Sequence, residues 1–293
     1  MGWNYAMSWL VVLPLELTAA GITVDYWNSG VNVGVFITVF LILIVAINFC
    51  GVRGYGEAEF VFSIIKVIAV IGFIILSVVI DCGGAPEGGY VGAHTWHDPG
   101  ALANGFKGVC TVFVTAAFAF AGTELVGLAA AECANPRKTI PRATKQVFWR
   151  ITLFYIISLF LVGLIVPYNN SQLLNGESSV DIKASPFVIA IQNAGVKVLP
   201  SIFNGVILIS VLSVGNSSTY GSTRTISALA EIGQAPKIFT YIDKKGRPLV
   251  ALAFALLFSG LAYINIAPVG PTVFNWLLAL SGLSSFFTWY TPQ

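Results

Sequence analysis

The sequence contains little charge, little cysteine and little histidine, and each shortage excludes a class of function. Only 10% of its 293 residues are charged, and the net charge of +2 leaves no basic stripe that would follow nucleic-acid phosphates. The four cysteines stand far apart, with no C-x-x-C spacing, and His94 and His97 are the only histidines. We therefore expect no disulfide framework, no metal site and no cofactor. No nucleophile, base or metal-ligand set falls at a common depth, so we expect no enzyme.

Apolar residues are what the sequence has in abundance. They make up 56% of the chain, and the mean hydropathy of +0.83 is well above that of soluble domains. We predict a multi-pass integral membrane protein of the all-α class, with residues 1–293 as one transmembrane domain. The first apolar stretch is too long and too polar for a signal peptide. Eight windows have roughly the 20 residues that a spanning helix needs: Tyr5–Trp27, Val31–Phe49, Phe60–Ile80, Gly108–Ala131, Ile151–Val166, Phe187–Val214, Leu249–Ala267 and Thr272–Tyr290.

Basic residues mark alternate connections between these windows. Arg53 lies in the second connection, five basic residues lie in the fourth (132–150) and four in the sixth (234–249), which together hold ten of the 15. Cytoplasmic connections retain Lys and Arg, so we predict that these three face the cytoplasm. The cluster in the fourth would also suit an anionic lipid, but its prolines and the charge rule explain it as a topological anchor. Asn169, in an outer connection, begins an N-x-S sequon whose use the sequence leaves open.

Three ionisable side chains inside the windows are candidates for a functional role: Glu16, Lys66 and Glu124. Such residues are costly in a membrane and usually functional. Lys66 lies about two turns into its window, among isoleucines and valines. One interpretation is a lysine that snorkels to the interface; the other is a buried amine that gains and loses a proton during a working cycle. Glu16 is then a candidate counter-ion for Lys66.

The stretch FAFAGTELVG (118–127) interrupts an apolar window with two glycines, a threonine and a carboxylate. Glycine weakens a helix, and a break near Gly122 would leave main-chain groups without helical partners at membrane depth. Irregular backbone is tolerated there only where it lines a cavity or is buried in protein. We predict a broken helix that offers carbonyls to a cationic ligand group, with Phe118 as a lid. The alternative is an ordinary helix with small residues at a helix contact.

Hydroxyl groups are dense in SVGNSSTYGSTR (213–224). Ser213, Asn216 and Ser217 would either pair with a neighbouring helix or ligate a cation. The alternative is that these side chains bond back to their own helix, as Ser and Thr often do.

FAFAGTELVGLAAAECANPRKTIPRATKQVFWRI followed by LIVPYNN resembles the fungal amino-acid permeases of the amino acid–polyamine–organocation superfamily. The resemblance extends to GWNYAMSWLVVLPLELTAAG, YGEAEFVFSIIKVIAVIGF, SPFVIAIQNAGVKVLPSIFNGVILISVLSVGNSSTYGSTR and FNWLLALSGLSSFFTW. These five segments occur in order and cover essentially the whole chain.

The resemblance implies a twelve-span layout whose first ten helices form two inverted repeats, the leucine-transporter architecture. On that layout this chain begins at the third helix and stops within the tenth, so it resembles a fragment. The family's opening helix, a glycine-rich broken helix that holds the substrate carboxylate, has no counterpart here. We therefore expect that the 293-residue chain alone is a product that does not transport.

The resemblance also assigns site residues. In the substrate site it places the unwound stretch of the sixth helix, which consists here of Phe118, Ala119, Phe120, Ala121 and Gly122. It adds the carboxylate of Glu124, which follows that stretch, and Ser281, a tenth-helix serine near the side-chain pocket. For proton coupling it implies Lys66, at a position where related permeases carry a lysine that stands in for a sodium ion. Glu16 resembles the family's third-helix glutamate. Ser213, Asn216 and Ser217 lie in the eighth-helix region that faces the cation position.

The function that the resemblance implies is proton-coupled symport of amino acids across the plasma membrane by alternating access. Its expected partners are an amino-acid substrate, a proton and the lipid bilayer. The alternative is a permease-like sensor that binds amino acids without appreciable flux. The sequence does not indicate which amino acids are carried, although Glu16 would suit a basic side chain.

Overall fold

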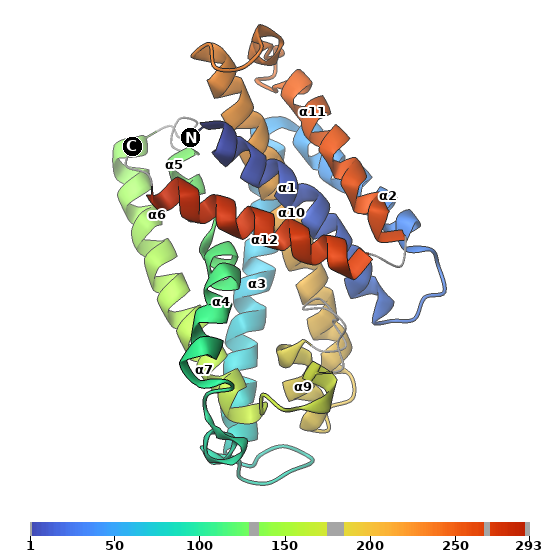
Figure 1. Ribbon diagram of the computed structural model, residues 1–293, viewed down its shortest axis with the longest axis vertical. Coiled ribbons are helices and arrows are strands. Elements are labelled where there is room, and N and C mark those ends of the chain that lie inside the picture. Colours follow the sequence, from blue (N-terminus) through green and yellow to red (C-terminus); the bar gives the residue numbers. More distant parts are fainter. Residues whose placement is uncertain (1, 129–134, 175–184, 267–269, 291–293) are drawn as a thin grey trace. The chain divides into compact units, whose positions relative to one another are not determined.

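The computed structural model describes residues 2–128, 135–174, 185–266 and 270–290, and the regular structure in these ranges is entirely helical (Figure 1). A π-helical segment, Ile151–Ile156, joins α6 to α7, a π turn covers Trp96–Gly100, and 3₁₀ turns cover Lys237–Thr240 and Gly260–Ile266. The α-helices are α1 (Gly2–Asp25), α2 (Val33–Phe49), α3 (Gly51–Asp81), α4 (Gly105–Phe120), α5 (Leu125–Leu128), α6 (Pro136–Arg150), α7 (Ile157–Ile165), α8 (Ser171–Leu174), α9 (Pro186–Asn193), α10 (Leu199–Glu231), α11 (Leu249–Ser259) and α12 (Gly270–Tyr290).

Helices long and apolar enough to cross a membrane confirm the all-α membrane class. Among the described residues there are four, Gly2–Asp25, Gly51–Asp81, Pro136–Ile165 and Leu199–Glu231, and a fifth if the broken segment between Gly105 and Gly127 counts as one span. Shorter apolar helices occupy the second, seventh and eighth windows. The predicted window ends at Ala131 and Ala267 lie outside the described residues.

Two predicted boundaries are wrong. The sixth window, Phe187–Val214, is two helices, because α9 ends at Asn193 and Gly195 turns the chain with a φ of +73° before α10 begins. The fourth connection is helical from Pro136 onward, with the proline in the first turn, where a missing N–H costs nothing. Its basic side chains are exposed along α6, so this positive segment extends the spanning helix of α7.

The described chain divides into two compact units. Unit 1 comprises residues 1–62, 113–122 and 208–293, and unit 2 comprises 63–112 and 123–207. In unit 1, α1 is almost wholly buried and packs against α12, α2 and α11. Leu10 of α1 lies in a core cluster with α10 and α11, and Leu13 and Leu17 lie in another with α2. An apolar helix enclosed on all sides can be apolar all round, which explains why α1 resembles a membrane span without an amphipathic stripe.

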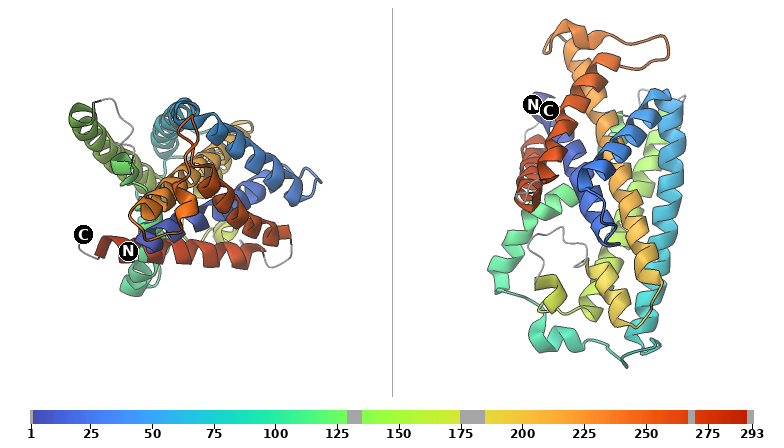
Figure 2. Two further views of the ribbon diagram at one scale, coloured as in Figure 1. Left: turned by 90° about the horizontal axis from the view of Figure 1, so that it is seen from above. Right: turned by 90° about the vertical axis from the view of Figure 1, so that its right-hand side faces the viewer.

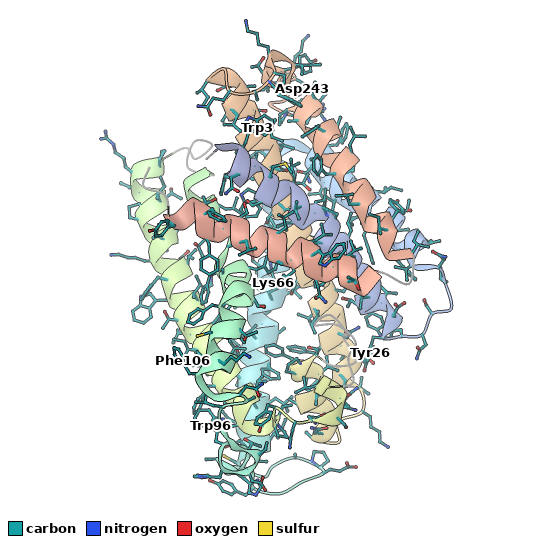
Figure 3. The ribbon with its side chains drawn as sticks, viewed as in Figure 1. Trp3, Tyr26, Lys66, Trp96, Phe106 and Asp243 are labelled. Carbon is teal, nitrogen blue, oxygen red and sulfur yellow. The ribbon has the colours of Figure 1, made fainter. Side chains whose placement is uncertain are left out.

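The α1–α2 and α10–α11 connections of unit 1 lie at opposite ends. The Arg247 guanidinium on the α10–α11 connection donates to the Phe49 carbonyl at the end of α2 (2.6 Å), and the Trp3 indole at the start of α1 donates to the Gln234 carbonyl (2.8 Å). Tyr26, on the α1–α2 connection, and Asp243, on the α10–α11 connection, mark the two ends (Figure 3). In the right-hand view of Figure 2 the α10–α11 connection forms one tip of unit 1. Within unit 1 the basic second and sixth connections therefore share one end.

Unit 2 has its own core and its own set of connections. Phe73 of α3 packs against Phe187 of α9, with ring centroids 4.9 Å apart, in a cluster that includes α7. The Thr95 hydroxyl and the Trp96 indole donate to carbonyls at the end of α7, which fastens the third connection to that helix. Asn169 lies nearby in sequence, in an exposed turn after α7.

Candidate functional site

The predicted break at Gly122 is present. Helix α4 ends at Phe120, and residues 121–124 form a turn. Gly122 has a φ of +90°, a backbone conformation that is unfavourable for residues with a Cβ atom. The Ala121 N–H donates to the carbonyls of Ala117 (3.0 Å) and Phe118 (3.1 Å), so the helix tightens before it stops. Phe118 is half-buried, whereas Ala119 and Phe120 are exposed on unit 1.

Glu124 follows the break and belongs to unit 2. One of its carboxylate oxygens is buried and has no hydrogen-bond partner among the described residues. Its main-chain carbonyl accepts from the Gly127 N–H (2.8 Å), which closes the short turn of α5. A carboxylate oxygen buried without a donor is unfavourable, so this group is a candidate for binding a donor from a ligand.

Lys66 lies in the middle of α3, fifteen residues from each end of that helix (Figure 3). At 1.5 Å per residue each end is about 22 Å away, which is far beyond the reach of one side chain. The structure places Lys66 in unit 2 and half-buried, and Glu16 in unit 1. Their pairing as ions stays a prediction.

Glu59 is the centre of a polar cluster within unit 1, between the first turns of α3 and the middle of α10. The Ser213 hydroxyl donates to one carboxylate oxygen of Glu59 (2.7 Å), and the Asn216 amide donates to the other (2.9 Å). The Asn48 amide of α2 donates in turn to the Asn216 side-chain oxygen (2.9 Å). We call these four residues the Glu59 clamp.

The side of α3 that carries the clamp also carries Tyr55. Its hydroxyl donates to Ser217 (3.2 Å), and its ring stacks on Tyr220, with centroids 4.3 Å apart and planes 7° apart. Ser213, Asn216 and Ser217 therefore pair with a neighbouring helix, which is one of the three outcomes left open for them by the sequence. Other hydroxyls of the same stretch, such as those of Thr219 and Thr223, bond back to α10 itself.

Glu16 approaches α10 from α1 at the same level. The Glu16 Cβ lies 3.4 Å from the position that a Cβ on Gly215 would occupy, and the end of Ile44 lies 3.2 Å from it. Gly215 therefore allows α1 and α2 to pack closely on α10. Two carboxylates, Glu16 and Glu59, flank α10 on different faces within one turn.

Ser281 is buried in α12 and its carbonyl accepts from the Ser285 hydroxyl (3.1 Å). Three positions further along α12, Ser284 exchanges hydrogen bonds with Asn4 of α1. Ser281 thus lies near the polar seam between α12 and α1, within unit 1.

The comparisons with known proteins identify the family. A sequence profile described as amino acid permease matches residues 1–291. The chain is 65% identical over 99% of its length to the general amino-acid permease GAP2 of Candida albicans, and 60% identical over 98% to the general amino-acid permease GAP1 of Saccharomyces cerevisiae. It is 55% identical to the amino-acid permease GAP5 of Candida albicans. This chain therefore belongs to the amino acid permease family, as its sequence motifs predicted.

The match covers only part of each relative. The aligned region is 49% of GAP2 and 48% of GAP1. The chain thus spans about half the length of the curated relatives it matches.

Proposed function

We propose that the chain is part of a proton-coupled amino-acid symporter of the plasma membrane. The observation that carries this proposal is the broken helix at Gly122, inside a segment that is otherwise apolar enough to span. Broken helices at membrane depth are the pattern expected of substrate sites in secondary transporters. In this proposal Phe118–Gly122 receives the substrate ammonium, Glu124 lies beside it, and Ser281 faces the side-chain pocket.

The proposed orientation follows from unit 1. Arg53, Lys244, Lys245 and Arg247 gather at one end, where α2 meets α3 and α10 meets α11. Positive charge stays on the cytoplasmic side of membranes, so this end faces the cytoplasm. By the order of the connections along the sequence, the connection that contains Asn169 alternates with the basic ones, so we propose that it faces outward.

In this proposal Lys66 exchanges the coupled proton, and Glu16, Ser213, Asn216 and Ser217 are further residues assigned to coupling. The position of Lys66 in the middle of α3, half-buried among isoleucines and valines, supports this role, because ionisable side chains inside spanning helices are costly and usually functional. The exchange of that proton during the cycle would couple substrate movement to the pH gradient.

The test uses a full-length permease in which this segment replaces the matching half of the Saccharomyces cerevisiae relative. Lys66→Met should retain amino-acid binding and abolish accumulation driven by an inward proton gradient. The matched control is Lys107→Met, which changes an exposed lysine. Undiminished pH-driven accumulation in Lys66→Met would refute the coupling role. Binding without uptake in the unmodified chimera would instead favour the sensor.

A further inference from the structure

Most basic side chains of α6 share one face of that helix, an arrangement that the proposed function does not use. At about 100° per residue, four exposed side chains spaced four, three and four positions apart lie within about 60° of one another. We call these four residues the basic stripe: Lys138, Arg142, Lys145 and Trp149. The partly buried side chains of α6 lie on the opposite side of the helix: Ile140, Ala143 and Val147. The basic stripe therefore faces away from the side on which α6 is packed.

The charge of the basic stripe is not offset by acidic side chains. The sequence of α6 contains no Asp or Glu, and no side chain of the stripe forms an ion pair with a described residue. Both prolines of the segment lie in the first two turns of α6, so neither makes it a loop. The charge rule of membrane topology requires positive charge on one side of the membrane, but not on one face of a helix. The one-sided arrangement is therefore an additional feature, and it suits an anionic partner.

The length of the helix indicates where that partner lies. Helix α6 continues through the π-helical segment into α7, and Pro136–Ile165 has the length and composition of one membrane span (Figure 1). At 1.5 Å per residue its 30 residues are about 45 Å long, whereas the hydrocarbon core of a bilayer is about 30 Å thick. About 15 Å of the helix therefore extends beyond that core. The basic stripe is about 16 Å long and occupies this part, at the level of the lipid headgroups.

The end of the basic stripe nearest the apolar part of the helix fits a lipid. Trp149 is 59% exposed, and exposed apolar side chains follow it at Leu153 and Ile156. Tryptophan is enriched at the membrane–water interface, where acyl chains meet headgroups. A lipid whose chains lie against Leu153 and Ile156 has its headgroup beside Arg142 and Lys145. We propose that the basic stripe binds the headgroups of anionic phospholipids. The assignment to the cytoplasmic leaflet rests on the proposed orientation.

The experiment titrates dioctanoyl phosphatidylserine into the purified chain in non-ionic detergent, followed by calorimetry, with dioctanoyl phosphatidylcholine for comparison. One basic side chain near an anionic lipid surface contributes a factor of about five in affinity. Arg142→Gln/Lys145→Gln should therefore weaken phosphatidylserine binding by about 25-fold. The matched control is Arg137→Gln/Arg150→Gln, which removes the same charge from exposed side chains of α6 that lie about 110° to either side of the stripe. It should weaken binding by less than about fivefold.

An exchange variant separates the position of the charge from its amount. Thr144→Lys/Lys145→Thr keeps the net charge and the composition, and moves one charge by about 100° around α6, off the basic stripe. Phosphatidylserine binding should weaken by about fivefold. An exchange variant with unchanged affinity, equal binding of the two lipids, or equal losses in the stripe and control variants would overturn the proposal.

Soluble anions identify the source of the ligand. Glycerophosphoserine, which carries the headgroup without acyl chains, should not compete with phosphatidylserine; full competition would show that the stripe takes a soluble anion. If polyglutamate binds and phosphatidylserine does not, the partner is an acidic protein segment and the proposal is wrong. Melting temperatures without lipid separate lost binding from lost folding, and the exchange variant keeps the test valid if the double glutamine variant unfolds. Because binding is measured without transport, failure here is distinct from failure of the proposed function.

Discussion

Removal of the Glu59 carboxylate should lower the free energy of unfolding by an amount that can be worked out from its two hydrogen bonds. Glu59→Ala leaves the Ser213 hydroxyl and the Asn216 amide, at 2.7 and 2.9 Å, without their acceptor. An unpaired buried donor costs about 1–3 kcal/mol, so two partly buried donors together cost about 2–4 kcal/mol. Glu59→Gln keeps an acceptor for Asn216 and offers Ser213 a donor, so its cost should stay below about 1 kcal/mol.

The assay is thermal unfolding of the purified chain in detergent, followed by tryptophan fluorescence. For a chain of this size about 1 kcal/mol shifts the melting temperature by about 2 °C, so Glu59→Ala should lower it by roughly 4–8 °C. Glu57→Ala is the matched control, because Glu57 lies two residues away with a side chain that is 70% exposed and pairs only with Arg53 in the described chain. Its effect should be below about 1 kcal/mol.

A double-mutant cycle isolates the contact itself. If Glu59 and Asn216 act through one hydrogen bond, Glu59→Ala and Asn216→Ala together should cost less than the sum of the single changes by about 1 kcal/mol or more. Additive effects, or equal shifts for Glu59→Ala and Glu57→Ala, would show that the clamp does not hold α3 to α10.

Three further results are expected. Gly122→Ala should cost about 1–2 kcal/mol because of its φ of +90°, and should reduce uptake by the chimera, whereas Gly127→Ala, which meets no atom within 4 Å, should be neutral in both assays. Arg247 lowers the pKa of Asp243 from 3.8 to about 2 by hydrogen bonding, so Asp243 stabilises the α10–α11 connection above about pH 4 and loses this effect as the pH falls towards 2. The protection factor of the Lys245 amide, which is the intrinsic exchange rate divided by the observed rate at the same pH, should therefore fall over that interval and stay constant in Asp243→Asn. If Asn169 is glycosylated in a eukaryotic host, Asn169→Gln should remove a glycosidase-sensitive mass from the protein, whereas an identical mass before and after glycosidase treatment would show that the sequon is unused.

The class of fold was predictable because it depends on composition. Apolar windows of about 20 residues with few charges have the length and composition of spanning helices, and the helix lengths confirmed the class. Boundaries were less predictable, since apolar residues continue through breaks. Gly195 ends α9 by its backbone conformation, and nothing in the apolar pattern of Phe187–Val214 distinguishes it from a glycine within a helix.

The break at Gly122 was predictable from local residues, because glycine beside small residues weakens a helix wherever it occurs. The partners of the α10 hydroxyls were not, because they lie on helices distant in sequence. Ser213 and Glu59 are separated by 154 positions. Local composition indicated that Ser213, Asn216 and Ser217 needed partners at membrane depth, but only the packing of α3 on α10 identified them.

Glu59 was missed because it lies beside Glu57 in the second connection, just before the predicted window that begins at Phe60. If this connection is treated as part of a helix, Glu57 and Glu59 lie on different faces of it. At about 100° per residue, positions 57 and 59 differ by about 200° around α3, and Arg53, one turn before Glu57, is its natural partner on the outer face. Glu59 then has to point towards the helices that α3 packs against, where a carboxylate is stable only if donors meet it. Asn216 and Ser213 on α10 are those donors. The hydroxyl and amide groups of α10 and the Glu59 carboxylate of α3 thus satisfy each other, because the carboxylate needs buried donors and the donors need a buried acceptor.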